Sequence, residues 1–424
     1  MYNDYNIGFP ICQWGKEHFM INACVIGLGG RGFGLLKYVL LKSEDIRIVS
    51  LCDLYEDRIT RALDHVKQFG MTDAKGFTDY KEALNVRGVD AVFIFSDWST
   101  HTEIALYAMK KGIAVASEVG CEYTLENCFE LVRTQEATGT PYMFVENCCW
   151  GKEELLATSM VRKNLLGTVV HCSGAYGHDL RNEIAYGHVN RHYRFDNYRD
   201  RCCENYPTHE LGPIAKLLNI NRGNRILTVS SFASKACGLE EYIQTREDAT
   251  EEMKNTKFKQ GDIVTTILTC SNGETIHLTL DTTLPHSYSR MFTVRGTKGA
   301  YYQDTNSVFL DGDKEFWKPV EYYQTAMDNA KRFEEEYLPS LWKNITPEEK
   351  QLGHGGMDWF SYKAFFDALQ QKQEMPVDVY DAATWQSVAV LSEISIQQGG
   401  APQAMPDFTN GKWFKRPAKD VCEL

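Results

Sequence analysis

The sequence comprises 424 residues, 43% of them hydrophobic and 24% charged, which is typical of a folded chain of two or three domains. A formal net charge of −12 without any basic run argues against nucleic acid and against an anionic membrane surface as partners. No stretch of about 18 apolar residues occurs, so we predict no transmembrane helix.

Residues 1–20 have no hydrophobic period and lack the basic start and apolar core of a secretory signal, so we expect an N-terminal extension before the first strand. This favours a cytoplasmic location, or an exported one if a leader has been removed. The thirteen cysteines are an odd number and include no C-x-x-C pair. They indicate mostly buried thiols in a reducing compartment and no structural zinc, and we predict no metal site.

From residue 21 to about residue 150, short apolar runs alternate with helical patterns. We predict strands at 21–26, 46–52, 90–95, 113–117 and 142–145, and helices at about 34–43, 55–69, 100–111 and 124–138. Nearly continuous apolar runs are typical of parallel strands covered on both faces, so we expect a doubly wound α/β domain of the Rossmann type. A capping-box pattern from Thr100 to Glu103 is expected to begin the third helix, and Gly112 to end it.

The first predicted strand ends in a turn with three spaced glycines. Gly27 allows the tight turn, Gly29 lets the backbone approach a pyrophosphate, and Gly32 lets the next helix pack close to the strand. Asp53 follows about 20 residues later, at the end of the second strand, where it can bind a ribose 2′-hydroxyl. No arginine is adjacent to Asp53, which favours NAD over NADP. The alternative is a tight turn that binds nothing. The predicted cofactor-binding residues here are Gly27, Gly29, Gly30, Arg31, Gly32 and Asp53.

The pattern changes after residue 150. A helix at about 152–164 is followed by alternating stretches that predict a large, mostly antiparallel open sheet with one wet face. Its expected strands are 168–176, 225–236, 261–270, 275–283, 290–296 and 300–310. Further helices are expected near His209, with Pro213 in the first turn, and at about 357–371 and 380–397. We therefore expect an extension (1–20), an NAD-binding domain (21–150) and a substrate-binding α+β domain (151–424).

Polar and aromatic clusters follow several of the predicted strands, where such folds bind ligands. Trp98, His101 and Glu118 lie at the carboxyl edge of the first sheet and are predicted to bind the cofactor. The alternatives are a helix-start histidine that only packs, and a solvated glutamate.

A second group of clusters belongs to the second domain. Tyr176 and His178 end its first strand, and Tyr206 and His209 lie near the start of a helix. A helix N-terminus favours the neutral imidazole, which can accept a proton, and a tyrosine three residues earlier adds another acid/base group. The alternative is an N-cap turn with a buried histidine.

With these clusters in place, residues 21–150 resemble the Gfo/Idh/MocA family of NAD(P)-dependent oxidoreductases. From about residue 21 to 415 the chain resembles glycoside hydrolase family 109, the NAD-dependent α-N-acetylgalactosaminidases. The motifs that carry the resemblance are Glu146-Asn147-Cys148-Cys149-Trp150-Gly151, Met160-Val161-Arg162-Lys163, Gly174-Ala175-Tyr176-Gly177-His178-Asp179-Leu180-Arg181, Asn205-Tyr206-Pro207-Thr208-His209, Thr283-Leu284-Pro285-His286-Ser287-Tyr288-Ser289-Arg290, Gly353-His354-Gly355-Gly356-Met357-Asp358 and Val379-Tyr380-Asp381-Ala382-Ala383.

The resemblance implies a hydrolysis in which bound NAD takes a hydride from sugar carbon 3, the aglycone leaves by elimination, water adds at carbon 1, and the hydride returns. NAD-using glycosidases need no pair of catalytic carboxylates. The site residues that it implies are Tyr206, His209 and Tyr176 for catalysis, Arg194, Tyr288 and His178 for substrate binding, and Asn147 beside the cofactor.

One departure bears on the activity. Oxidoreductases of the wider superfamily usually carry Glu-Lys-Pro where this chain has Glu118-Val119-Gly120, and Val119 cannot move a proton as a lysine does. This argues against an ordinary sugar dehydrogenase. Two alternatives stay open, namely a sugar oxidoreductase that releases its keto product and a non-enzymatic sugar or nucleotide sensor. We expect a small glycoside as partner, and a homo-oligomer formed through the open sheet.

Overall fold

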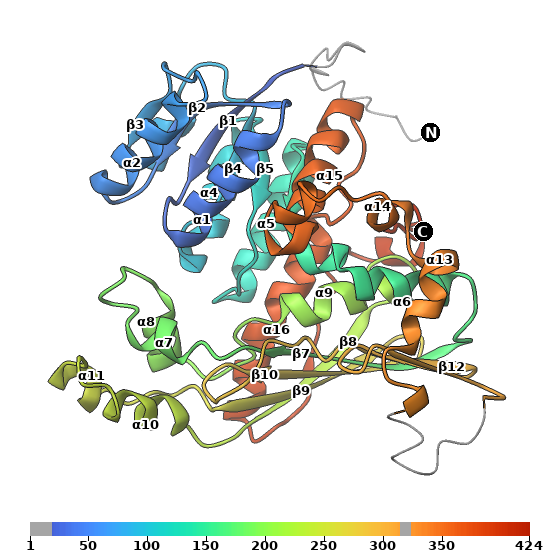
Figure 1. The fold of residues 1–424 in the computed structure, drawn as a ribbon. Coiled ribbons are helices and arrows are strands. Elements are labelled where there is room, and N and C mark those ends of the chain that lie inside the picture. Colours follow the sequence, from blue (N-terminus) through green and yellow to red (C-terminus); the bar gives the residue numbers. More distant parts are fainter. Residues whose placement is uncertain (1–18, 314–323) are drawn as a thin grey trace, which may run out of the picture.

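The computed structural model describes residues 19–313 and 324–424, so the expected extension lies outside the described residues except for its last two positions. Figure 1 shows a smaller sheet flanked by helices, formed by the first third of the chain, and a larger sheet formed by the remainder. The helices α9 (Thr208–Leu217) and α16 (Val379–Gln397) contact elements of both parts. In the described part of the chain, no helix is long and apolar enough to cross a membrane.

The smaller sheet is parallel, in the order β3-β2-β1-β4-β5-β6. Its strands are β1 (Ile21–Ile26), β2 (Ile46–Cys52), β3 (Lys75–Phe77), β4 (Ala91–Ile94), β5 (Ala114–Ser117) and β6 (Tyr142–Phe144). Its helices are α1 (Gly30–Tyr38), α2 (Glu56–Lys67), α3 (Tyr80–Leu84), α4 (Trp98–Lys110) and α5 (Leu125–Thr138). The strand order reverses between β1 and β4, and ligands of doubly wound folds bind at the carboxyl ends of strands at such a point.

The predicted Rossmann architecture is confirmed, with corrections to local detail. The short β3 and α3 were not predicted, and α1 begins at Gly30 rather than at residue 34. The capping box from Thr100 to Glu103 is wrong, because α4 begins at Trp98 with Asp97 as its N-cap. The Asp97 carboxylate accepts from the backbone N–H of Ser99 at 2.7 Å. An aspartate at this position is at least as good a cap as a threonine.

The larger sheet is mostly antiparallel, in the order β13-β12-β11-β7-β10-β9-β8-β14, and only its β7–β10 pair is parallel. Its strands are β7 (Val169–Gly177), β8 (Ile226–Ala233), β9 (Ile263–Cys270), β10 (Thr275–Asp281), β11 (Thr293–Gly296), β12 (Gly299–Tyr302), β13 (Ser307–Leu310) and β14 (Gln403–Ala404). The stretch predicted as one strand over 300–310 is the hairpin of β12 and β13. The helices α6 (Lys152–Arg162), α7 (Arg181–Ala185), α8 (Arg194–Asp200), α10 (Gly238–Gln244) and α11 (Glu251–Asn255) lie between or beside these strands.

The helix predicted near His209 is α9, and it packs closely on β7. A Cβ at Gly174 of β7 would lie 2.8 Å from the Cβ of Glu210, so this glycine allows the close approach. Pro213 lies in the second turn of α9 rather than in the first as predicted, because the helix begins at Thr208. Proline has no N–H, so the carbonyl of His209 receives no helical hydrogen bond from Pro213.

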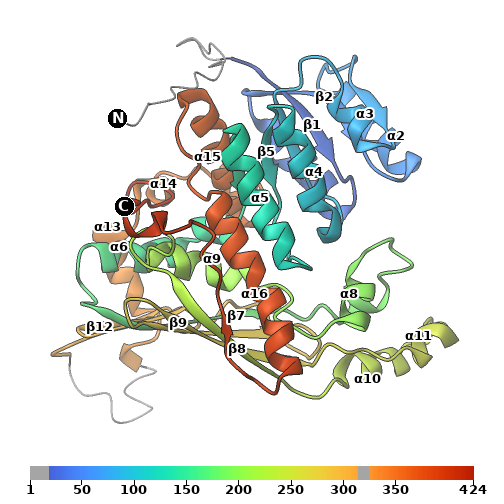
Figure 2. The same cartoon turned by 180° about the vertical axis from the view of Figure 1, so that it is seen from behind.

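The C-terminal segment returns to the parallel sheet. The helices α13 (Glu334–Tyr337), α14 (Ser340–Lys343) and α15 (Met357–Gln371) precede α16. The ring of Phe93 in β4 contacts Phe365 and Phe366 of α15, with centroids 5.6 and 6.1 Å apart. Figure 2 shows α16 beside α5. Residues far apart in the sequence therefore share one core with the parallel sheet. All twelve cysteines among the described residues are free thiols.

Two carboxyl groups are buried where α9 meets the larger sheet. Glu204 and Glu210 are both shielded from solvent. Burial raises the pKa of Glu204 to about 8, and burial together with the nearby Glu204 charge raises the pKa of Glu210. The folded chain therefore holds a proton on Glu204 that the unfolded chain releases above its usual pKa of 4.5. The resulting stability is fully present below about pH 4.5 and is lost as the pH rises through 8.

We predict that Glu204→Gln unfolds at a higher temperature than the unsubstituted protein at pH 8, by about 2 °C or more, because glutamine carries no charge to bury. The difference should shrink at pH 5. Thermal unfolding at both pH values measures it, with the exposed Glu252→Gln as control. A Glu204→Gln difference that does not depend on pH would contradict the assigned burial effect.

Candidate active site

The glycine turn between β1 and α1 has the shape of a dinucleotide site. Gly27 has φ +93°, and a Cβ there would lie 2.4 Å from the carbonyl carbon of Phe95; a Cβ at Gly32 would lie 2.0 Å from the Gly27 oxygen. Gly30 instead borders open space, since a Cβ there would meet no atom within 4 Å, whereas a Cβ at Gly29 would lie 3.5 Å from Nη1 of Arg58. Gly29 caps α1 without a side-chain hydrogen bond, so N–H groups at this helix end remain for an anion. These residues fit a bound pyrophosphate.

Asp53 lies at the carboxyl end of β2, as predicted, and supports the turn. Its Oδ2 accepts from the backbone N–H of Leu28 at 2.6 Å, and its Oδ1 accepts from that of Tyr55 at 3.0 Å. Arg58 of α2 approaches the same carboxylate, with Nη1 3.6 Å from Oδ2. No arginine is adjacent to Asp53 in the sequence, but helix geometry places Arg58 beside it.

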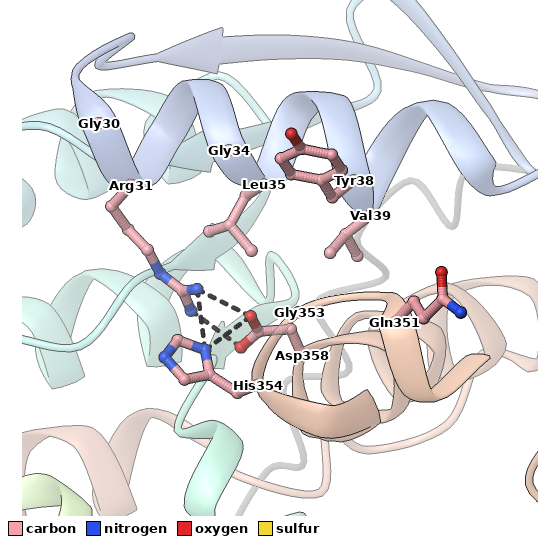
Figure 3. Close-up of a pocket in the computed structure, with 10 residues that line it drawn as sticks. All are labelled: Gly30, Arg31, Gly34, Leu35, Tyr38, Val39, Gln351, Gly353, His354 and Asp358. Carbon is pink, nitrogen blue, oxygen red and sulfur yellow. Dashed lines mark hydrogen bonds and ion pairs between the residues drawn. The ribbon is translucent and has the colours of Figure 1, made fainter. Parts of the chain in front are cut away.

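Arg31 points away from the turn, toward the C-terminal segment, as Figure 3 shows. Its guanidinium binds both carboxylate oxygens of Asp358 at 2.7 and 2.9 Å and lies 3.1 Å from Glu118. Asn147 donates to the same Asp358 carboxylate at 2.7 Å, and Tyr362 donates to Glu118 at 3.1 Å. Two predicted cofactor residues, Arg31 and Asn147, therefore share Asp358, and a third, Glu118, joins them through Arg31.

Burial alone would raise the pKa of Asp358, but the Arg31 guanidinium and the His354 contact hold this pKa well below its usual value. The carboxylate is thus an anchor for Arg31. A cavity of about 350 Å³ borders this anchor between α1 and the segment before α15, and Gly30, Arg31, His354 and Asp358 are among the residues that line it (Figure 3). The motif Gly353–Asp358, one of those that carry the family resemblance, thus supplies the partner of Arg31.

The three predicted catalytic rings meet at the carboxyl end of β7. The ring centroids of Tyr206 and His209 are 4.7 Å apart, those of Tyr176 and Tyr206 are 4.7 Å apart, and those of Tyr176 and His209 are 5.4 Å apart. Burial raises the pKa of Tyr176 to about 12 and also raises the pKa of Tyr206. Both phenols therefore hold their protons at neutral pH and can donate them.

The predicted substrate residues surround these rings. The Nδ1 atom of His178 lies 3.2 Å from the Tyr176 hydroxyl, and its ring centroid lies 5.2 Å from that of Tyr288. Burial lowers the pKa of His178, as does the charge of Arg194. Tyr288 is 48% exposed and lies at the rim of the cluster.

Arg194 and Trp98 form the side of the cluster that faces the parallel sheet. The Trp98 indole stacks on Tyr206 with centroids 5.3 Å apart, and the Arg194 guanidinium lies 5.1 Å from Trp98 and 5.2 Å from Tyr206. Arg194 is held by Glu183 at 2.9 Å, while its buried Nη1 has no hydrogen-bond partner. A Cβ at Gly120 would lie 2.6 Å from the indole, so this glycine makes room for Trp98.

His101 lies on α4, behind Trp98. Its Nε2 lies 2.9 Å from the carbonyl oxygen of Ser96, so the ring is fixed against the loop that follows β4. Burial lowers the pKa of His101. The ring is thus neutral beside the expected cofactor position.

Glu146 also belongs to this cluster, although no role was predicted for it from the sequence. Its Oε1 lies 2.7 Å from Nδ1 of His209 and also accepts from the backbone N–H of Cys148 at 3.0 Å. Burial alone would raise the pKa of Glu146, but the His209 contact holds this pKa below its usual value. An Nδ1–H that donates to this carboxylate leaves Nε2 with its lone pair free to accept a proton. From the sequence, His209 was predicted as a proton acceptor because of its place near a helix start and because of Tyr206, three residues earlier.

Glu146, Cys148 and His209 are also near enough to one another to share a metal ion. In this structure the histidine nitrogen and the carboxylate bind each other instead. Burial raises the pKa of the Cys148 thiol well above its usual value.

The glycine turn, Asp53 and the switch point of the parallel sheet define an NAD-binding enzyme, and residues 21–146 match the family model of the Gfo/Idh/MocA oxidoreductases with an NAD-binding Rossmann fold. Residues 150–415 match the model of the glycosyl hydrolase 109 C-terminal domain. The chain therefore belongs to glycosyl hydrolase family 109, and it is an NAD-dependent glycosidase.

Relatives along the whole length agree with this assignment. A glycosyl hydrolase family 109 protein of Stenotrophomonas maltophilia is 38% identical over 420 residues, covering 93% of this chain and 90% of the relative. The alpha-N-acetylgalactosaminidase of Tannerella forsythia is 35% identical over 425 residues, covering 95% and 89%. Levoglucosan dehydrogenase in complex with NADH and levoglucosan matches with a TM-score of 0.67 at 14% identity, covering 91% of this chain and all of that chain, which shows the fold alone.

We predict that Gly32→Ala weakens NAD binding at least about tenfold, because its Cβ would strike the Gly27 carbonyl and open the turn. Gly34→Ala, on the same helix, meets no atom within 4 Å and should retain NAD while making α1 slightly more stable. Isothermal titration calorimetry with NAD compares the NAD affinity of the two variants. Unchanged affinity in Gly32→Ala would contradict the assigned role of the turn.

Proposed function

We propose that this glycosidase hydrolyses α-N-acetylgalactosaminides or related glycosides by oxidation at sugar carbon 3, elimination of the aglycone, addition of water and re-reduction. The observation that carries the proposal is the meeting of Tyr176, Tyr206 and His209, with Glu146 behind His209, between the glycine turn and the larger sheet. The name of the Tannerella forsythia relative supports the choice of sugar.

The cofactor would be held by the glycine turn and by Asp53. When bound, NAD supplies a reversible hydride acceptor, so that a sugar carbon can be oxidised and later reduced within one turnover. Oxidation at carbon 3 acidifies the hydrogen on carbon 2, and elimination then breaks the bond from carbon 1 to the aglycone. The chain's own task is to move the protons of these steps.

His209 is the proposed base for the proton on carbon 2. The Glu146 carboxylate fixes Nδ1 as the protonated nitrogen, so Nε2 accepts that proton, exchanges it with solvent, and later delivers a solvent-derived proton to carbon 2. Tyr206, which keeps its proton at neutral pH, donates to the departing oxygen. Tyr176 passes its own proton to Nδ1 of His178 as it takes up the proton of the carbon 3 hydroxyl, and both protons move back when carbon 3 is reduced again.

Arg194, Tyr288 and His178 are the proposed substrate-binding residues. The unpartnered Nη1 of Arg194 offers a buried donor to a sugar oxygen. Trp98 and Tyr206 stack on each other and would form a wall that holds this sugar beside the cofactor.

We also propose that the outward face of the larger sheet pairs with a second copy of the chain, since Val170, Phe232 and Ile267 are exposed there.

We predict that the protein with its bound NAD releases nitrophenol from a nitrophenyl α-N-acetylgalactosaminide over many turnovers without accumulating NADH. Absorbance at the nitrophenol and NADH bands measures both at once. NADH formed in proportion to product would favour the sugar oxidoreductase instead. Because the chemistry assigned here uses no metal ion, a strong chelator should leave the rate unchanged.

We predict that His209→Ala and Tyr206→Phe lower kcat by about 100-fold or more while NAD stays bound, since each removes a proton-transfer group. Glu146→Gln should lower kcat at least about tenfold, because an amide fixes the imidazole less strongly. The exposed Glu252→Gln is the matched control. If the protein were a non-enzymatic sensor, none of these substitutions would change its binding of sugar or nucleotide or its biological output.

A further inference from the structure

The connection between α7 and α8 extends from the second half of the chain toward the helices of the parallel sheet, as Figure 1 shows. We call residues 187–193 the strap. The Nη1 atom of Arg191 in the strap lies 2.8 Å from the Asp57 carboxylate of α2. In return, Nη2 of Arg58 donates to the carbonyl oxygens of Asn190 and Arg191 at 3.3 and 3.4 Å.

The strap contacts α2 at Asp57, which lies at the adenosine end of the cofactor site. Tyr55 is two residues beyond Asp53, and its ring contacts two guanidinium groups, 4.3 Å from that of Arg191 and 4.8 Å from that of Arg58. Leu54, between Asp53 and Tyr55, is 80% exposed. The ribose of a dinucleotide binds at the residue that corresponds to Asp53, so its adenine lies next to this exposed stretch.

The strap is held in one shape. Arg191 has φ +54°, a conformation that a non-glycine residue keeps only where its surroundings enforce it. The backbone N–H of His192 donates to the carbonyl of Gly187 at 2.7 Å, and Tyr193 packs on Trp98 with ring centroids 4.8 Å apart. Arg194 follows directly, so the strap connects the adenosine end to the substrate cluster.

We propose that the strap is a retaining device for the cofactor: it crosses the adenosine end of the site and, through Arg191, Asp57 and Tyr55, keeps NAD bound from one turnover to the next. The proposal rests on the proposed function, in which NAD is regenerated and need not leave. An exposed ion pair is screened by salt, so the release of NAD should become faster as ionic strength rises.

The test measures the dissociation rate of bound NAD, by diluting the NAD-loaded protein and following free NAD over time. We expect Arg191→Glu and Asp57→Arg each to release NAD about five to thirty times faster than the unsubstituted protein. The double variant Asp57→Arg with Arg191→Glu restores the ion pair in reverse and should return the rate to within about threefold. Arg199→Ala, which removes another exposed arginine from α8, is the matched control and should change nothing.

The proposal would be overturned if both single variants released NAD at the rate of the unsubstituted protein. It would also be overturned if the double variant released NAD no more slowly than the single variants. Should the single variants not fold, the salt dependence of the unsubstituted protein decides: a release rate independent of salt overturns the proposal. Glycoside hydrolysis is assayed separately. Strap-dependent retention without hydrolysis would overturn the proposed function alone, whereas hydrolysis with strap-independent release would overturn only the strap.

Discussion

The contact between Glu146 and His209 joins the two halves of the chain at the point where the rings of Tyr176, Tyr206 and His209 meet. Glu146 follows the last strand of the parallel sheet, and His209 lies in the first turn of the helix that packs on the larger sheet. One carboxylate thus fixes the orientation of the histidine and sets α9 against the cofactor domain. The positions of Tyr206, one turn earlier, and of Tyr176 on the neighbouring strand follow from where α9 lies.

A second buried contact, between Arg31 and Asp358, fixes the cofactor turn to the C-terminal segment. Glu118 binds Arg31, Asn147 binds Asp358, and Tyr362 of α15 binds Glu118. These contacts couple the glycine turn to the strand ends and to α15. Breaking one partner of such a buried pair leaves an uncompensated charge, which is strongly destabilising. Residues more than three hundred positions apart therefore determine the shape of one cofactor site.

Much of the fold could be predicted from the sequence, because the glycine turn and the alternation of strand and helix are local signals. The ends of strands and helices also pointed to Tyr176, Tyr206 and His209, since such ends meet at one edge of a sheet. The contacts of Glu146, Asp358 and Tyr362 could not be predicted, because each joins segments that only the tertiary fold brings together. The capping box at Thr100 failed for a local reason, since Asp97 offers a competing cap three residues earlier.

The structure explains why glycine occurs at position 120 and which cation is present although position 119 is valine rather than lysine. Gly120 leaves the space that the Trp98 indole fills, and the cation nearest to Tyr206 and Trp98 in the described contacts is Arg194, from the other half of the chain. A valine after Glu118 therefore does not leave the site without a positive group. Arg194 cannot lose its proton, which suits binding and charge stabilisation rather than proton transfer. This agrees with our proposal that the tyrosines and His209 transfer the protons.

The most direct test of this account follows the hydrogen on carbon 2 of the sugar. Elimination removes that proton, and the addition of water puts one back from solvent. Hydrolysis of a nitrophenyl α-N-acetylgalactosaminide in D₂O should therefore give a sugar product that carries deuterium at carbon 2, detectable by NMR or mass spectrometry. A product formed at full rate with only its original hydrogen at carbon 2 would contradict the account.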